Sequence, residues 1–420
     1  MTIDSGGCYD TAPCESTQLF GKGVEIQIEI PQTICFQAML NTFPKAAKQK
    51  LILFSVRPGR IELCFDAMAK AITWKKSLTE MQERSMKTRL AVLMTALILT
   101  GVQAQSQQVP LKLVQTIQLP ADLKGHFDHF EVDLKGNRLF ATPEDYKSVL
   151  VFDLKTGKPV HKIGGIGKPH AVLYREDVNR IYVTDGADGD VKIFDGTTYA
   201  ALASVKLLED ADSIGFDAST KYLYIDNGGG DVHEKYSMLS VVDTTAGKKV
   251  ADIKVDGDTL EAMALEKSSP KIYVNNKDKN EVDVVDREKR QVIASWPVTK
   301  GKPNVAMAFD EANHRLFVAC RSGVVVVMDT QTGKELSTFP ITKGVDDMIY
   351  DVASKRIYSA SDGSVDVYQQ TDPDNYKLLA TVPTGPAAKT ARLVPEIGRY
   401  FVAVPQHGST NASILVYEVH

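Results

Sequence analysis

The sequence has little cysteine, and most of it lies at one end. Only five of the 420 residues are Cys; four of these fall within the first 64 residues, and Cys320 stands alone in the remainder. A lone thiol cannot form an internal disulfide, so the long C-terminal part is not a disulfide-stapled domain. The chain also lacks a C-x-x-C-H haem-attachment motif, zinc-finger spacing and a G-x-S-x-G elbow. Covalent haem, zinc-finger and serine-hydrolase functions are therefore without support.

An excess of positive charge is missing as well. The 49 Lys and Arg residues against 53 Asp and Glu give a formal net charge of −4, which argues against nucleic acid as a main partner. Apolar residues make up 43% and charged residues 24%, with a mean hydropathy of −0.15, as in ordinary globular proteins. The apolar run at 90–102 is shorter than the roughly 20 residues that a membrane-spanning helix needs.

This apolar run instead has the features of an export signal. A basic stretch at 86–89 precedes it, and the small-residue site Val102-Gln103-Ala104 follows it. We predict a signal peptide over 86–104, starting at Met86 and cleaved near Ala104, and a periplasmic or secreted bacterial protein. No Cys stands directly after the cleavage site, so no stable membrane anchor is expected after signal removal. Residues 1–85 show no regular pattern and are interpreted as an upstream extension from a mis-called start; a cytoplasmic extension with a signal anchor is the alternative.

Residues 105–420 contain seven copies of one unit. Each copy has a basic or aromatic residue followed by two apolar residues, and the copies recur at intervals of 41 to 49 residues. The seven anchor residues are Arg138, Arg180, Tyr222, Lys271, Arg315, Arg356 and Arg399. A second apolar strand follows each anchor, as at 149–153 and 282–286, and several of these strands end in Asp before a polar turn. Short strands rich in Val, Ile, Tyr and Phe, with no helical period between them, predict four antiparallel strands per unit.

Seven units of four strands predict an all-β fold, a single seven-bladed β-propeller. A β-sandwich is the alternative, but a sandwich has no reason to repeat its sequence seven times. The last unit lacks a fourth strand, whereas the segment 111–120 has the pattern of a fourth strand with no partner before it. We therefore predict that 113–119 pairs with 413–419 and closes the ring without an exposed edge. A monomer is expected.

The repeat motif resembles that of a known family. The segments RIYVTD at 180–185 and KIYVNN at 271–276, each followed by a V-x-V/I-x-D strand, resemble the YVTN-type repeat. This family is also called YncE-like and belongs with the quinoprotein-amine-dehydrogenase-like propellers. The resemblance covers about residues 111–420, and blades 3 and 7 depart from it with YLYIDN and RYFVAV. It implies the fold, but because the family holds binding proteins, lyases and redox subunits, it does not assign a function.

A ring of ionisable residues is predicted at one mouth of the central channel. The first strand of each propeller blade lines the channel, and this strand opens ten residues before each anchor. The seven residues at that position are Asp128, His170, Asp212, Glu261, Val305, Asp346 and Lys389. Further polar candidates lie beside them: His126, His129, Asn304, Asp347 and Arg392. Polar groups that open an otherwise apolar strand need water or a partner.

Two interpretations of this ring stay open. The residues either cap strand starts around channel water, or they bind a ligand or a divalent metal ion. The metal-ligand candidates are His126, Asp128, His129, His170, Asp212 and Glu261, with carboxylates suited to Ca²⁺ and imidazoles to Zn²⁺ or another transition metal. Convergence of three or more ring residues on one point would favour the metal. Lys389 and Arg392 could bind an anionic group, and His233, in an insertion at 227–236, is expected over the same mouth.

The function predicted from these features is a binding or scaffold module. Its ligand, a small molecule or a protein, would bind at the loop-rich channel face, and no nucleic acid partner is expected. The alternative is a metal-dependent lyase or lactone hydrolase that uses the Asp/His/Glu ring for metal binding and proton transfer. A redox subunit with a bound quinone rests on fold analogy alone.

Overall fold

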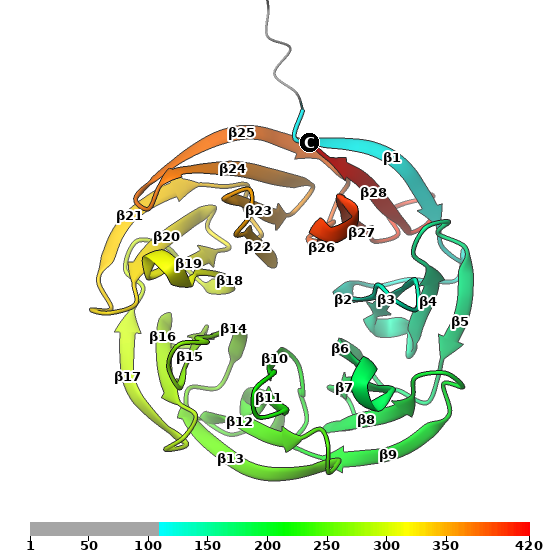
Figure 1. The fold of residues 1–420 in the computed structure, drawn as a ribbon, viewed down its shortest axis with the longest axis horizontal. Helices are drawn as coiled ribbons and strands as arrows, with labels where there is room; N and C mark the ends of the chain where they lie inside the picture. Colours follow the sequence, from blue (N-terminus) through cyan, green and yellow to red (C-terminus); the bar gives the residue numbers. More distant parts are fainter. Residues whose placement is uncertain (1–108) are drawn as a thin grey trace, which may run out of the picture. The chain divides into compact units, whose positions relative to one another are not determined.

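The computed structural model describes residues 109–420, which form a ring of seven four-stranded antiparallel sheets (Figure 1). This confirms the predicted all-β, seven-bladed propeller. The innermost strands surround the centre of the ring and the fourth strands form its rim. The predicted extension at 1–85 and the predicted signal peptide at 86–104 lie outside the described residues. Among residues 109–420 there is no helix long and apolar enough to cross a membrane.

The strands follow one another from the centre to the rim within each blade. Blades 1 and 2 comprise β2 (Phe127–Asp133), β3 (Arg138–Pro143), β4 (Val149–Asp153), β5 (Pro159–Ile163), β6 (Pro169–Arg175), β7 (Arg180–Asp185), β8 (Asp190–Asp195) and β9 (Ala201–Lys206). Blades 3 and 4 comprise β10 (Ile214–Asp217), β11 (Tyr222–Gly228), β12 (Tyr236–Asp243), β13 (Lys248–Asp256), β14 (Leu260–Leu265), β15 (Lys271–Asn276), β16 (Glu281–Asp286) and β17 (Gln291–Pro297). Blades 5 and 6 comprise β18 (Asn304–Asp310), β19 (Arg315–Cys320), β20 (Val324–Asp329), β21 (Glu335–Pro340), β22 (Asp347–Asp351), β23 (Arg356–Ser361), β24 (Ser364–Asp372) and β25 (Asn375–Pro383). Blade 7 comprises β26 (Thr390–Val394), β27 (Arg399–Val404), β28 (Ser413–Val419) and β1 (Leu111–Gln118).

Five short 3₁₀ helices interrupt the connections between strands. They are η1 (Glu144–Tyr146), η2 (Glu176–Val178), η3 (Gly229–Val232), η4 (Glu311–Asn313) and η5 (Pro395–Ile397). The helix η3 belongs to the insertion that lengthens blade 3. All seven anchor residues stand at the first position of a second strand, so the repeat motif marks the same place in every blade.

The aspartates that end the third strands build the turns that follow. In five blades the Asp side chain accepts hydrogen bonds of 2.7–3.2 Å from the backbone N–H groups two and three residues later. These residues are Asp153, Asp195, Asp243, Asp286 and Asp329. Such side-chain turns satisfy donors that the strand ladder leaves free. The strand-Asp-turn pattern of the sequence therefore has a direct structural cause.

The core lies between neighbouring blades. Residues of the second and third strands are buried on both faces, which explains their nearly continuous apolar runs, as in VLVFD and VVVMD. The outer strands alternate instead, since one face of each is exposed to solvent, as in β17. Packing between adjacent sheets thus fixes the ring and, with it, the positions of the inner strands.

The N-terminal strand closes the ring as predicted. β1 pairs with β28 in antiparallel register from Leu111 opposite Val419 to Gln118 opposite Ser413, with a bulge between Leu113 and Gln115. The observed strand begins two residues before the predicted segment and ends one residue before its end. Ile117, which is buried, joins the apolar cluster that contains Ile414 and Val416 of blade 7.

A substitution in this closing strand tests how much the closure stabilises the protein. Ile117→Ala should lower the free energy of unfolding by about 2 kcal/mol, because it removes buried methyl groups and leaves a cavity. Leu113→Ala is the matched control in the same strand; Leu113 is 50% exposed, and its loss should change stability little. Urea denaturation of the two variants measures the difference. Equal effects of both substitutions would contradict the role given to β1.

Candidate functional site

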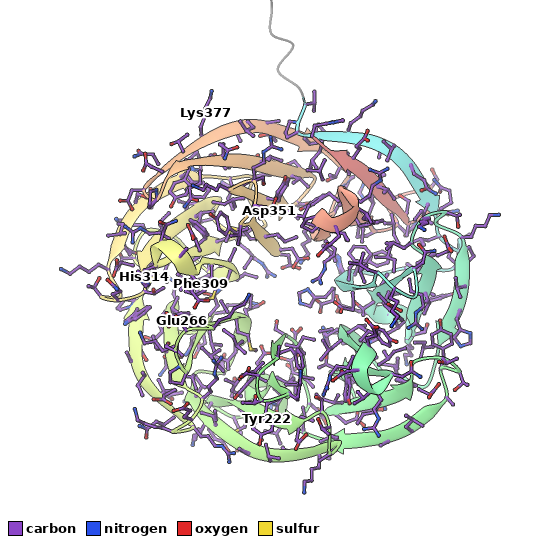
Figure 2. All side chains as sticks on the ribbon, in the orientation of Figure 1. Tyr222, Glu266, Phe309, His314, Asp351 and Lys377 are labelled. Carbon is purple, nitrogen blue, oxygen red and sulfur yellow. The ribbon has the colours of Figure 1, made fainter. Side chains whose placement is uncertain are left out.

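Bulges at the start of the inner strands turn the ring residues toward the channel. In β2, β6 and β14 the pairing with the second strand skips two residues, and Asp128, His170 and Glu261 lie in these irregular segments. The side chains of Thr142 and Thr184 hydrogen-bond to the backbone there, which supplies partners that the ladder lacks. A bulge re-aims side chains away from the regular alternation. Figure 2 shows side chains reaching toward the centre of the ring from the inner strands.

One cavity of about 230 Å³ collects most of the predicted ring. The predicted residues that line it are Asp128, His129, His170, Asp212, Glu261, Val305, Asp346 and Lys389. The cavity also contacts Glu144, Lys168, Asp210, Ser213, Thr259, Leu260, Ala262, Lys277 and Arg321. We call this cavity the channel mouth. It brings together groups from all seven blades, and most of them are polar.

His170 is the most deeply buried polar residue of the channel mouth, with 3% of its surface exposed. Its Nδ1 contacts Asp128 Oδ2 and lies 3.5 Å from Asp212 Oδ1. Burial opposes its charge, but the carboxylates of Asp212 and Asp128 raise the pKa of His170 to about 9. Its Nε2 makes no hydrogen bond within the described residues and faces Gly186, where an added Cβ would lie 2.6 Å from that nitrogen. Gly186 is therefore the residue that leaves room for the imidazole.

His129, in the neighbouring blade, lies between two carboxylates of the channel region. Its Nε2 is 3.2 Å from Asp128 Oδ1 and its Nδ1 is 3.4 Å from Asp347 Oδ1. Despite burial, the charges of Asp128 and Asp347 hold the pKa of His129 well above its usual value. The same two imidazoles lower the pKa of the Asp128 carboxyl, although burial acts in the opposite direction. Asp128 is thus an ionised carboxylate between two cationic histidines.

In contrast to Asp128, the carboxyl groups of blade 3 have raised pKa values. Burial, together with the charges of Asp128 and Glu261, raises the pKa of Asp212 to about 8. Burial also raises the pKa of Asp226 well above its usual value, and nearby carboxyl groups add to the effect. The pKa of Asp210 is raised by burial and by Asp231. We call Asp210, Asp212 and the adjacent Asp226, which lies just outside the cavity lining, the acidic side of the channel mouth. Asp212 holds its proton near neutral pH, because burial and the neighbouring carboxyl groups outweigh the nearby cations.

The cations of the channel mouth are already paired. Lys277 Nζ lies 2.5 Å from Glu261, and Arg321 Nη2 and Lys389 Nζ lie 2.6 and 2.8 Å from Asp346. Each pair joins two blades or two strands across the rim of the cavity. Because these acids neutralise the cations, little positive charge is left to bind an anionic group here.

Four predicted site residues lie elsewhere. His126 is exposed and does not line the cavity, and His233 is exposed at the end of η3, so neither joins the ring. Arg392 pairs with Glu131 at 3.2 Å, outside the cavity lining. Asn304 is buried and donates to Asn275 Oδ1 and to the carbonyl of Glu281, which ties blades 4 and 5 together. The expectation that these four side chains lie at the mouth was wrong. His126 and His233 are in exposed loops, an ion pair holds Arg392, and interblade hydrogen bonds hold Asn304.

Several lining residues were missed by the sequence analysis. Glu144, Lys277 and Arg321 each stand six residues after an anchor, at the end of the second strand. That position meets the start of the inner strand because the two strands are antiparallel. Counting downstream from the anchors as well as upstream would have found these three residues. Lys168 and Asp210 carry no such signal, since they lie in the loops that lead into the inner strands.

Three of the predicted metal-ligand candidates converge. Asp128, His129 and Asp212 each offer a ligand atom, and these atoms lie within 4.8 Å of one another. A second group of this kind is His170, Asp210 and Asp212. Asp212 is common to both, so it stands at the centre of any cation site in the channel mouth. Whether a metal binds there stays a prediction.

Sequence comparisons match part of the chain to known proteins. Residues 232–346 match the family described as Cytochrome D1 heme domain. "Uncharacterized protein YncE" of Salmonella typhi is 31% identical over 115 residues, and the protein of the same name in Salmonella typhimurium is 30% identical over 115 residues. Each match covers 27% of this chain and 32% of the relative, so the matched part spans about a third of those curated proteins.

Solved structures share the fold across a larger part of the chain. Kuenenia stuttgartiensis hydrazine synthase matches with a TM-score of 0.59 and 18% identity, covering 70% of this chain and 96% of the other. The mitotic checkpoint complex matches with a TM-score of 0.60 and 12% identity, covering 74% and 92%. At these identities the likeness concerns the fold alone.

The residues of the channel mouth do not fit a haem. A haem is larger than most drug-sized ligands, whose pockets measure roughly 300–1,000 Å³ and are mostly apolar. The channel mouth measures about 230 Å³ and is lined mainly by charged groups. Its most buried imidazole, that of His170, is held by Asp128 on one side and by Gly186 on the other. The family match therefore concerns the propeller and not the cofactor.

The fold and the comparisons agree with each other. Seven blades of four strands form the ring, two YncE proteins match at about 30% identity, and the matched haem-domain family is itself a β-propeller family. The chain is thus a seven-bladed β-propeller that resembles the YncE proteins, as its YVTN-type repeats predict.

Proposed function

We propose that this protein is an exported ligand-binding propeller whose channel mouth takes a small, positively charged ligand. The observation that carries the proposal is the surplus of carboxyl groups on the acidic side. Asp210, Asp212 and Asp226 all have raised pKa values, and Asp212 reaches about 8. Carboxyl groups packed together in this way stay protonated unless a cation enters among them.

The size and the hydrogen bonding of the cavity support a small ligand. A volume of about 230 Å³ holds a hydrated metal ion or a short amine rather than a drug-sized molecule. Asp226 lies beside Asp212 but outside the cavity lining. Its Oδ1 is buried and makes no hydrogen bond within the described residues, so no cation of the described chain offsets this carboxyl group.

Titration calorimetry of the full chain with Mn²⁺, and separately with ethylammonium, tests the proposal. We expect at least one of the two cations to bind, with an affinity that rises about tenfold per pH unit between pH 6 and 8. The rise follows because the cation displaces the proton that Asp212 holds up to about pH 8.

Asp212→Asn should weaken the binding at least about tenfold, since a charged hydrogen-bonding partner is removed. Glu234→Gln is the matched control: it removes one negative charge from the exposed insertion of blade 3, outside the cavity, and should leave the affinity unchanged. Failure of both cations to bind, or equal affinities for the two variants, would overturn the proposal.

A metal-dependent enzyme is the second candidate. It is favoured by the convergence of Asp128, His129 and Asp212, because two carboxylates and an imidazole suit a divalent metal. The raised pKa of Asp212 would suit a general acid or base near neutral pH. This function requires that Mn²⁺ rather than ethylammonium binds, and that the Mn²⁺-loaded protein adds water to a lactone to release the hydroxy acid. If Mn²⁺ binds tightly but no lactone is hydrolysed, the binding function stands and the lactone-hydrolase function is excluded.

A further inference from the structure

A second pocket lies between blades 3 and 4 on the face opposite the channel mouth. It measures about 500 Å³, within the range of small-molecule sites. The channel mouth is at the start of the inner strands, whereas this pocket is lined by the end of β10, the start of β11, and the loops after β14 and β16. The residues that decide its chemistry are Asp217, Tyr222, Lys267, Arg287, Glu288 and Arg290.

Four of the corresponding grooves between neighbouring blades are bridged by the chain itself. In blades 1, 2, 5 and 6 the anchor residue is an Arg that donates to the next blade. The accepting groups are the carbonyl of Gly196, the carbonyl of Thr245, the carboxylate of Asp374 and the carbonyl of His420. In the first of these grooves the Arg138 guanidinium also lies 4.6 Å from the ring centre of Tyr174 and 5.7 Å from that of Tyr199. Guanidinium and aromatic rings together occupy that space.

Blade 3 is different because its anchor is Tyr222, which Figure 2 labels. A phenol ring is shorter than an arginine side chain and carries no positive charge to bridge the groove. Instead, the next blade supplies the cations: Arg287 and Arg290 come from the turn between β16 and β17. The pocket is therefore open at a blade whose anchor is a tyrosine and not a basic residue.

The pocket has a fixed cation and a surplus of positive charge. The Arg287 side chain is only 12% exposed; its Nη2 donates to the carbonyls of Glu266 and Ser269, and its Nε lies 3.5 Å from Asp217. Asp217 also accepts hydrogen bonds from Ser219, and the Arg287 guanidinium balances its charge. Lys267 and Arg290 are exposed at the rim, where Glu288 is the one further acid of the lining. Glu311, outside the lining, is already held by the backbone N–H groups of Lys267 and Ser268. The rings of Tyr222 and Tyr224 form an aromatic part of the pocket wall.

We propose that this pocket binds a small organic oxyanion, a phosphomonoester or a carboxylate with an aromatic or other flat body. The oxyanion would take the Lys267 and Arg290 cations beside the fixed Arg287, since guanidinium groups match the geometry of phosphate and carboxylate. The body of the ligand would lie against Tyr222, in the space that an anchor arginine bridges in four other blades. The volume of about 500 Å³ leaves room for both parts.

The test is titration of the full chain with phenyl phosphate, benzoate and inorganic phosphate. Phenyl phosphate or benzoate should bind, and inorganic phosphate should bind more weakly because it makes no contact with the tyrosine wall. The double variant Lys267→Ala/Arg290→Ala should weaken binding at least about tenfold. Tyr222→Arg should abolish it, because the new side chain bridges the groove as in blades 1, 2, 5 and 6.

Two controls separate the pocket from general effects of charge and folding. Lys334→Ala removes an exposed cation from the corresponding turn of blade 5 and should leave the affinity unchanged. Asp212→Asn, at the channel mouth, should also leave it unchanged. The proposal fails if neither organic anion binds, if inorganic phosphate binds as tightly as phenyl phosphate, or if Tyr222→Arg and the double variant both bind like the unmodified protein.

Discussion

Asp128→Asn is expected to lower the free energy of unfolding by about 3 kcal/mol. The substitution removes the carboxylate that holds His170, and a buried imidazolium without its counter-ion costs several kcal/mol. The loss stays at the lower end of that range because asparagine keeps one hydrogen-bonding oxygen and because Asp212 lies 3.5 Å from the same nitrogen. Urea denaturation of the full chain at pH 7 measures the change.

A matched substitution in the same ring shows whether the stability is lost through the Asp128–His170 pair or through the removal of any carboxylate. Asp346→Asn removes a carboxylate whose partners, Arg321 and Lys389, are 35% and 24% exposed, so the cost should stay below about 1 kcal/mol. In the double variant Asp128→Asn/His170→Gln no buried cation is left unpaired, and most of the lost stability should return. A loss of equal size at Asp128 and Asp346, or a double variant that is weaker by the sum of both changes, would contradict the account.

The free energy of unfolding should fall by at least about 3 kcal/mol between pH 6.5 and 9, which is the share of His170 alone. His170 has a pKa of about 9 in the folded protein, above the ordinary value of 6.5. The contribution of His170 to the free energy of unfolding is therefore fully present below pH 6.5 and is lost as the pH rises through 9. The raised pKa values of His129 and Asp212 act in the same direction, since in each case the folded protein holds the proton more tightly than the unfolded chain.

Urea denaturation at a series of pH values between 6 and 9 measures this fall. The His170→Gln variant should show a shallower dependence, because one of the protons is no longer linked to folding. A cation bound at the channel mouth should offset part of the loss at high pH, because a ligand that binds only the folded state stabilises it. A stability that is constant or rises over this range, or a His170→Gln variant with an unchanged slope, would show that these groups are not coupled as described.

The repeats made the fold predictable in detail. Seven anchors at nearly equal spacing define the blades, and an unpartnered strand at one end with a missing strand at the other implies the closure that β1 and β28 form. Each anchor also identifies the same place in its blade, so counting from it located Asp128, His170 and Asp212 at the channel mouth. The prediction succeeds because the inner strand pairs regularly with the second strand next to the anchor, so ten residues upstream reaches the same end of the inner strand with or without a bulge.

The remaining site residues depend on features that no repeat encodes. Lys168 and Asp210 reach the channel mouth from loops, and Asn304 is drawn away from it by hydrogen bonds to blade 4. His233 stands in the insertion of blade 3, whose length the sequence shows but whose path is set by contacts such as the hydrogen bond from Gly230 to Asp258. Loop paths and interblade contacts are tertiary features, so counting along one blade cannot reveal them.

The central claim is that the acidic side of the channel mouth binds a cation. Crystals of the full chain soaked in Mn²⁺ at about pH 8 test it most directly, through the anomalous scattering of the metal. The account predicts a peak at the channel mouth, within about 2.5 Å of carboxylate oxygens of Asp212 and of Asp128 or Asp210. A map without a peak at these carboxylates, from crystals of a protein that also fails to bind ethylammonium, would contradict it.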